Sequence, residues 1–406
     1  MRPAIILRIA SKEILSTLRD RRAIVSSLLI PLLVLPLVML GLPLLIGGLF
    51  EREQTTATEV AIQGLGNLPK DLRSDIETQG IVFTPVDDPE AAVREGSYAV
   101  SLAVPEGFES ALQEGQSELT VYSKTGNLRS ELSAGKLEDA ISTYQQALVA
   151  ERLREVGLEP SVLEPITINN RDARQQAERS SGQLAWLIPF FIAVWTLAGG
   201  QMTAIDATAG EKERGTLESL LVAPVRRAEV VVGKFLATMT FGLSAALMAI
   251  LGYVLGGTVL RQFFKLQGEE AQDIVSVMGG ALDVSAFGVV MLIISALLLA
   301  ALIAALLISI AMFARSFKEA QSYIAPLSFV LILPAVGLQF ADFFGSSPIL
   351  YLIPVLNTLI VMDDLVKGNA EVLPLLLTYG SSLAYTALLL DFAFRSFKRE
   401  GVIFRT

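Results

Sequence analysis

The stretch that decides the fold is VSAFGVVMLIISALLLAALIAALLISIAMFA, at residues 284–314, which carries no charge over 31 residues. A helix rises 1.5 Å per residue, so about 20 apolar residues cross the roughly 30 Å hydrocarbon core of a bilayer. Further charge-free apolar runs lie at residues 23–50, 183–205, 235–260, 320–341, 343–362 and 372–390. The sequence therefore predicts a polytopic α-helical membrane protein.

Composition agrees with a membrane location and excludes much catalytic chemistry. The chain has 406 residues, of which 52% are hydrophobic and only 18% charged, too apolar for an ordinary soluble domain. Cysteine and histidine are both absent. Disulfides, Cys/His zinc sites and Cys or His catalysis are thereby excluded. We expect no catalytic residue, no metal site and no cofactor bound by this chain.

Positive charge predicts how the chain threads the membrane, because Lys and Arg in short flanks are retained in the cytoplasm. Such residues cluster before the first run, between the second and third, between the fourth and fifth, and at the C-terminus. Two cytoplasmic ends require an even number of crossings. The run at 343–362 contains Gly345, Pro348 and Pro354, which break a helix, so it is predicted not to span. Six transmembrane helices remain.

These assignments predict the following order along the chain. It comprises a cytoplasmic amphipathic interfacial helix (1–22), the first transmembrane helix (23–50), an extracytoplasmic domain (51–180), the second helix (183–205), a cytoplasmic loop (206–234), the third helix (235–260), an external loop (261–283), the fourth helix (284–314), a cytoplasmic loop (315–319), the fifth helix (320–341), re-entrant or external broken helices (342–371), the sixth helix (372–394) and a cytoplasmic tail (395–406).

The N-terminal segment is predicted to lie along the inner face of the membrane. Leu7, Ala10, Ile14 and Leu18 fall within an arc of about 80° on a helical wheel, and basic residues gather on another side. Such a helix lies in the interface, with its basic face toward lipid headgroups or a partner protein. A simple anchoring helix without a protein partner fits the same pattern.

Residues 51–180 are predicted to form a small α/β domain inserted between transmembrane helices 1 and 2. The segment has 12 Lys and Arg against 23 Asp and Glu, a balance of −11. Short β-like stretches at 59–63, 80–83, 98–104 and 119–122 alternate with helical ones. The acidic residues are expected to form a solvated face rather than a metal site. No basic patch indicates nucleic-acid binding.

The predicted cytoplasmic loop at 206–234 carries the densest local signals. They are the turn glycines Gly210 and Gly215, the N-cap candidate Thr216, the apolar Leu217, Leu220 and Leu221, and the helix-ending Pro224. Together they predict a short amphipathic helix. It is too short to span a membrane and too apolar to lie free in water, so it needs a docking surface.

The segment GEKERGTLESLLVAP, at residues 210–224, resembles the signature loop of ABC-2 type transporter permeases. LRDRRAI at 18–24 and ARSFKEAQSY at 314–323 resemble further segments of that family. IPVLNT at 353–358, YAVSLAVPEGF at 98–108 and Asn127 resemble its NatB-like branch, which has a large external domain after the first span. In this family the signature loop forms a coupling helix that docks into a separate nucleotide-binding subunit.

The resemblance implies which residues couple the chain to its ATPase. They are Gly210, Glu211, Lys212, Glu213, Arg214, Gly215, Thr216, Leu217, Glu218, Leu220, Leu221 and Pro224, with Arg315, Lys318 and Glu319 in a second contact. It also implies an ATP-driven exporter of a substrate such as Na⁺, a drug, a peptide or a lipid. ATP and Mg²⁺ would be held by the ABC ATPase subunit, and a second permease subunit, identical or paralogous, would complete a dimer in the cell membrane. Substrate-binding residues stay unassigned.

The absence of a P-loop supports a separate ATPase. That motif, GxxxxGK[ST], holds phosphates with backbone N–H groups and a lysine. The Gly-Lys pairs of this chain, at 135–136 and 233–234, are followed by Leu137 and Phe235 and lack the earlier glycine. We therefore expect ATP hydrolysis on another polypeptide.

Other classes of membrane protein fit the sequence less well. A secondary transporter needs paired broken helices in inverted repeats, and only one broken segment is found. A membrane protease could use Glu269 and Glu270, but Ile274 stands where an arginine belongs in such a motif. A receptor or scaffold that binds a ligand through its external domain fits the architecture, although it does not explain the signature loop. It remains the alternative.

Overall fold

The computed structural model describes residues 1–41, 57–115, 117–163, 176–182, 185–216, 224–264, 284–340 and 347–397. The chain divides into two compact units. The helical unit comprises Met1–Pro43 and Ala173–Thr406, and the α/β unit comprises Leu44–Asp172. Each unit is described by itself.

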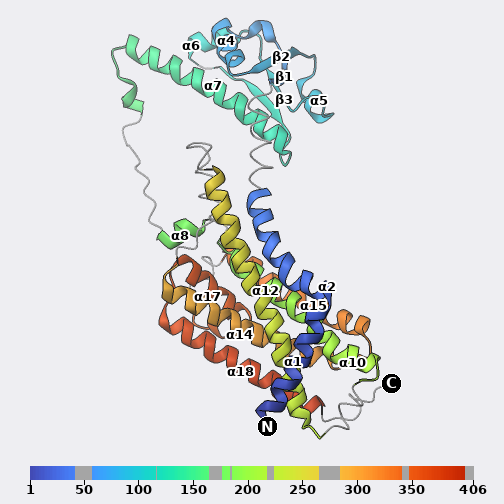
Figure 1. The fold of residues 1–406 in the computed structure, drawn as a ribbon. Coiled ribbons are helices and arrows are strands. Elements are labelled where there is room, and N and C mark those ends of the chain that lie inside the picture. Colours follow the sequence, from blue (N-terminus) through green and yellow to red (C-terminus); the bar gives the residue numbers. More distant parts are fainter. Residues whose placement is uncertain are drawn as a thin grey trace. The chain divides into compact units, whose positions relative to one another are not determined.

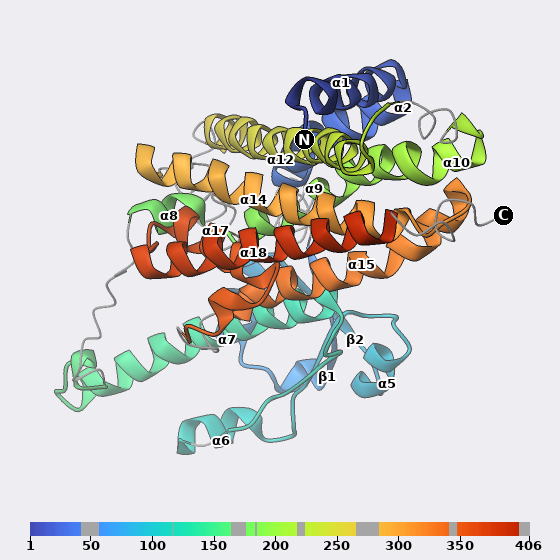
Figure 2. The same ribbon diagram turned by 90° about the horizontal axis from the view of Figure 1, so that it is seen from below.

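Six helices of the described residues are long and apolar enough to cross a membrane. They are Arg21–Gly41, Leu187–Glu213, Arg227–Gln262, Ala286–Ala311, Phe317–Phe340 and Val372–Phe397. This confirms the prediction of a polytopic α-helical membrane protein. Within the unit, α12 (Arg227–Phe264), α14 (Ala286–Ala311) and α18 (Val372–Phe397) pack side by side in that order (Figures 1 and 2).

Helix α9 (Leu187–Ile205) lies in the core of the helical unit, against α12, α14 and α15 (Phe317–Gly337). Glycines let α9 approach α12 closely. A Cβ atom added at Gly199 would lie 2.5 Å from the Cβ of Ala245, and one at Gly242 would lie 3.0 Å from the carbonyl oxygen of Thr196. Small residues at such contacts are typical of membrane helices, which associate through close packing.

The first membrane helix also packs against α12 through glycines. Pro36 lacks an N–H group and leaves the carbonyl oxygen of Leu32 without its helical partner. That oxygen lies against Gly252, where an added Cβ would be only 2.6 Å away. Gly256 similarly approaches Pro36. Pro31 and Pro36 are thus accommodated within a helix that runs on to Gly41.

In the described part of the segment expected to be broken, a 3₁₀ turn at Leu350–Leu352 precedes a short α-helix, α17 (Leu356–Lys367), which is not among the six long apolar helices. It begins after Val355, whose φ of 73° is rare for a β-branched residue. The buried amide of Asn357 donates hydrogen bonds to Ser381 and Ser382 of α18, at 2.9 and 3.2 Å. These polar contacts fix α17 against its neighbour, because a buried amide must be satisfied.

The α/β unit contains a four-stranded sheet in the order β2-β1-β3-β4. Strand β1 (Thr58–Gln63) pairs in parallel with β2 (Ile81–Pro85) and β3 (Val100–Ala103), and β3 pairs antiparallel with β4 (Thr120–Ser123). Inward-facing side chains such as Val60, Ile62 and Leu102 are fully buried. The helices of this unit are α4 (Lys70–Thr78), α5 (Pro89–Arg94), α6 (Phe108–Glu114) and α7 (Leu128–Glu155).

Helical structure extends further into the predicted 206–234 loop than its charges indicated. After α9 the chain continues through a π-helical turn, Asp206–Gly210, into α10 (Glu211–Glu213), and α12 already begins at Arg227. These residues lie outside the charge-free runs because they include Glu211, Glu229 and Lys234. These three side chains are buried and paired with opposite charges, so they lie within helical ends.

Candidate functional site

Glu211, the second residue of the signature loop (210–224), lies at the centre of a buried ionic cluster. Its two carboxylate oxygens each contact a lysine at 2.5 Å, one Lys12 of α1 (Pro3–Arg19) and the other Lys234 of α12. Glu13 of α1 completes the cluster, 3.1 Å from Lys12 and 3.3 Å from Lys234. We call these four residues the charge cluster. It joins the start of the signature loop to α1 and α12.

Three of the four side chains of the charge cluster are buried, so their charges require oppositely charged partners. Lys234 is 2% exposed, and Glu13 and Glu211 are each 4% exposed. Lys234 also donates a hydrogen bond to the carbonyl of Ala207. Burial opposes the charge on Lys12, but its hydrogen bond to Glu211 and the nearby Glu13 prevail and raise its pKa. Two positive and two negative charges therefore balance where an unpaired charge would be costly.

The next motif residues attach the loop to the turn between α14 and α15. The ammonium group of Lys212 donates hydrogen bonds to the carbonyls of Met312 and Ala314, the latter at 3.3 Å. The carboxylate of Glu213 accepts a hydrogen bond from the backbone N–H of Phe317 at 2.8 Å. This turn is next to the predicted second ATPase contact, and it lies against the signature loop.

The second predicted group divides into exposed and structural residues. Arg315 and Lys318 are exposed. Glu319 instead accepts hydrogen bonds from the backbone N–H of Arg315 at 2.7 Å and from the hydroxyl of Tyr323 at 2.5 Å. With Ser316 as N-cap of α15, Glu319 closes a reciprocal capping arrangement at the start of that helix.

The middle of the motif folds back on itself. Arg214 pairs with Asp206 at 2.8 Å, and that contact raises the pKa of the guanidinium group despite partial burial. Gly215 has a φ of 69°, the left-handed region that favours glycine. The hydroxyl of Thr216 donates to the carbonyl of Glu211 at 3.2 Å, and its predicted role as an N-cap stays a prediction. Gly210 packs directly against Asp206 and Arg214, where a Cβ atom would crowd both.

The predicted apolar face of the coupling helix lies outside the described residues. This applies to Leu217, Glu218, Leu220 and Leu221. The end of the loop is described again at Pro224, whose carbonyl accepts a hydrogen bond from the guanidinium group of Arg2 at 2.8 Å. Arg2 also pairs with Glu229 of α12 at 3.0 Å, and this hydrogen bond raises the pKa of Arg2.

Three residues that hold this site were missed from sequence. Glu13 and Glu229 were not singled out, and Lys234 was noted only among the positive charges between the second and third apolar runs. A usable signal exists for Glu13, because Ile9, Glu13 and Thr17 recur every four residues and share one buried helix face. At that face Gly233 meets α1, and an added Cβ would lie 2.6 Å from the Cγ2 atom of Ile9. Helix α1 therefore packs on α12, as Figures 1 and 2 show.

This packing changes what the amphipathic pattern of α1 means. Ala10, from the predicted apolar arc, is buried, but Leu7 and Leu18 are exposed in the isolated chain. The buried face is centred instead on Ile9, Glu13 and Thr17. A helix with one face on the protein and apolar side chains left outward is compatible with a position at a membrane interface.

The architecture and the site define a class: a polytopic helical membrane protein whose signature loop is tied to its long helices by buried charges. Comparisons with known proteins make the class specific. The model of the ABC-2 family transporter proteins matches residues 7–402, so the chain belongs to that family.

Two relatives show how far the similarity extends. The ABC transporter permease protein NatB of Bacillus subtilis (strain 168) is 29% identical over 388 residues, which cover 94% of each chain. The uncharacterized protein YhcI of the same organism is 29% identical over 154 residues, 36% of this chain and 48% of its own length. No solved structure matches the chain.

Proposed function

We propose that this chain is the membrane-spanning permease subunit of an ABC-2 type exporter, and that it couples efflux to ATP hydrolysis on a separate ATPase subunit. Membership of the family and the similarity to a permease support a transporter subunit. The observation that carries the coupling proposal is the charge cluster, which ties Glu211 of the signature loop to α1 and α12.

In this mechanism the ATPase docks on the signature loop and displaces it when ATP closes the two nucleotide-binding subunits. The charge cluster makes the loop, α1 and the start of α12 move together, since separating buried opposite charges costs several kcal/mol. Lys212 and Glu213 carry the same displacement to the turn before α15. Helix α1, the start of α12 and the turn before α15 thus move together with the loop. This movement switches the spans between their two states.

Several finer parts of the proposal come from the sequence pattern. Both termini and the signature loop lie in the cytoplasm, and the α/β unit is the extracytoplasmic domain between the first two spans. Two permease subunits, identical or paralogous, serve two ATPases that hold ATP and Mg²⁺. The substrate is Na⁺, a drug, a peptide or a lipid. A receptor or scaffold with a ligand-binding external domain is the alternative function.

Reconstitution with the ABC ATPase separates these functions. Vesicles holding both subunits should export one of the four substrate classes when ATP is supplied on the cytoplasmic side. Glu213→Arg, Arg214→Glu and Leu217→Ala should lower ATPase binding and substrate-stimulated hydrolysis, each by about tenfold, because they remove charged or apolar contacts at the docking surface. Arg94→Ala, on the exposed surface of α5, serves as the control and should change neither.

Two results would count against the proposal. If the three loop variants bound and stimulated the ATPase like the parent chain, the loop would not be the coupling element. A chain that copurified with no P-loop ATPase under any condition, yet bound a ligand through its α/β unit, would instead support the receptor.

A further inference from the structure

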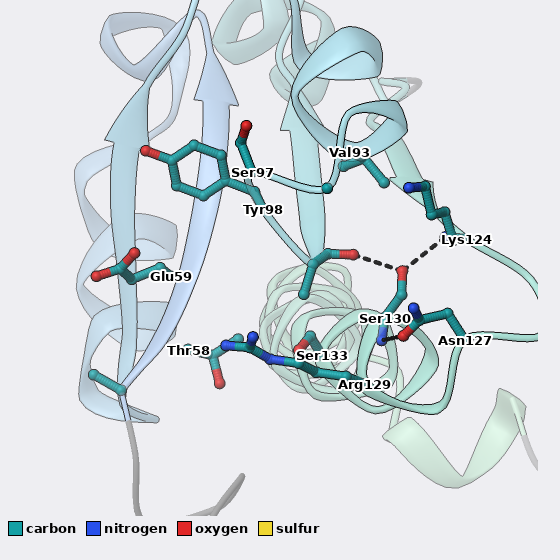
Figure 3. A pocket seen from close by; sticks show the side chains of 13 residues that line it. Thr58, Glu59, Val93, Ser97, Tyr98, Lys124, Asn127, Arg129, Ser130 and Ser133 are labelled. Atoms are coloured by element: carbon teal, nitrogen blue, oxygen red, sulfur yellow. Dashed lines mark hydrogen bonds between the residues drawn. The ribbon is translucent and has the colours of Figure 1, made fainter.

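A cavity of about 360 Å³ opens in the α/β unit, at the end of the sheet where β1 and β3 begin. It lies next to the turn between β4 and α7 (Figure 3). Its volume falls in the range of small-molecule sites, which begins at about 300 Å³. Nothing in the proposed coupling mechanism uses this cavity.

Hydroxyl groups form the inner surface of the cavity. Thr58, Ser130 and Ser133 are 6%, 3% and 1% exposed. The hydroxyl of Ser130 accepts a hydrogen bond from the backbone N–H of Lys124 at 2.7 Å and donates to the carbonyl of Ala99 at 2.5 Å, so its position is fixed. The hydroxyl of Thr58 accepts a hydrogen bond from Lys136 at 3.3 Å, which leaves its own proton available to a ligand.

Positive side chains flank these hydroxyls. Figure 3 shows Arg129 beside Thr58 and Lys124 beside Val93, with Ser130 between them. Glu59 is the one acidic residue of the described lining, and its carboxylate points away from the hydroxyls in the same view. Residues 51–180, which contain the cavity, have 23 acidic residues against 12 basic ones. The lining of the cavity is therefore more positive than the rest of this segment.

We infer that this cavity binds a small organic anion, through a carboxylate or phosphate group held between Lys124 and Arg129. Guanidinium and ammonium groups are the usual partners of both oxyanions, and charged hydrogen bonds to them are stronger than neutral ones. The hydroxyl of Thr58 adds a donor at the floor. The buried side chain of Val93 and the ring of Tyr98 line the wall and accommodate a carbon body, which distinguishes the ligand from a bare ion.

The test measures binding calorimetrically on the full chain in detergent, with glutarate, glycerol 3-phosphate and inorganic phosphate as separate probes. Glutarate or glycerol 3-phosphate should bind saturably at millimolar concentration, and inorganic phosphate more weakly. The probe that binds identifies the anionic group as carboxylate or phosphate. Raised ionic strength should weaken binding, because the contacts lie at an exposed rim.

Lys124→Ala and Arg129→Ala should each weaken binding by about tenfold or more, since each removes a charged hydrogen bond. Both side chains are exposed, so their removal leaves the core of the unit intact. Lys70→Ala, which removes an exposed cation of α4 outside the cavity, is the matched control and should bind like the parent. The inference is overturned if neither organic anion binds, if only inorganic phosphate binds, or if the Lys124→Ala, Arg129→Ala double variant retains the parent affinity.

Discussion

At the scale of residues, the charge cluster explains how four ionisable side chains can lie in an apolar molecule. Lys234 faces both Glu211 and Glu13 and is almost fully buried, whereas the side chain of Lys12 is 57% exposed. The two lysines are therefore not equivalent. Lys234 compensates charge that water cannot reach, and Lys12 pairs with Glu211 from a partly solvated position, where an ion pair contributes little.

This difference can be measured with two matched substitutions. Lys234→Met keeps the side-chain volume and leaves Glu211 and Glu13 without their buried partner, so it should lower the free energy of unfolding by about 3–5 kcal/mol. Lys12→Met should lower it by about 1 kcal/mol or less. Thermal unfolding of the purified chain in detergent, followed by loss of the monodisperse species, compares the two.

Adding Glu211→Gln to Lys234→Met removes the negative charge of Glu211, which has lost its partner Lys234, and should restore part of the lost stability. The assignment of Lys234 as the central charge would be wrong if Lys234→Met unfolded at the parent temperature, or if Lys12→Met were the more harmful of the two.

At the scale of elements, the contact between α1 and α12 places the N-terminal helix in the site. Gly233 permits this contact, because any larger side chain there would overlap Ile9. Arg2, at the beginning of α1, reaches Glu229 and the carbonyl of Pro224. Helix α1 thus contacts both ends of the signature loop. Lys12 pairs with Glu211 near the start of the loop, and Arg2 donates a hydrogen bond to Pro224 at the end of the loop.

Gly233→Ala should loosen this helix pair. Its new Cβ would sit 2.6 Å from Ile9, and overpacking of this kind costs about 1–3 kcal/mol. Ile9→Ala in the same chain makes room for the Cβ, so the double variant should be more stable than the sum of the single effects predicts. Gly380→Ala on α18, where nothing lies within 4 Å, is the control and should be neutral or stabilising. Additive effects of the two substitutions would contradict the close packing of α1 on α12.

Much of the element structure followed from sequence, and what failed has a physical cause. Apolar runs predicted the long helices because length and hydropathy alone decide whether a helix can cross a bilayer. The four strands lie at the β-like stretches identified between 59 and 122. At 206–234 the helices extend beyond the apolar runs, which the sequence did not indicate, since a charge in a sequence gives no sign of its partner. Glu13 and Lys234 are 221 residues apart and pair only in three dimensions.

The candidate site was predicted in part for the same reason. A motif identifies local residues, so it includes Glu211, Lys212 and Glu213, whose contacts hold the loop to the helical unit. Their role in coupling stays a prediction. The cavity between Lys124 and Arg129 was not foreseen, because its walls come from β1, α5, the start of β3 and the start of α7. No single stretch of sequence carries its pattern.

At the scale of the whole molecule, the proposed topology places the α/β unit and the end of α18 on opposite sides of the membrane. The chain contains no cysteine, so single cysteines can be introduced without altering a background. Lys70→Cys in α4 should react with a membrane-impermeant maleimide added outside intact cells. Arg395→Cys, near the end of α18, should react only after the membrane is permeabilised. Reaction of both from the same side would refute the topology.

The charge cluster also constrains how the molecule is made. Helix α1 is translated before α12, and Glu13 obtains its buried partner only after Lys234 has been synthesised, 221 residues later. Until then Glu13 must stay in contact with water, since an unpaired buried carboxylate is too costly. Helix α1 therefore docks on α12 only after Lys234 is in place. A helix that precedes α12 in the sequence thus reaches its final place only after the start of α12 has been made.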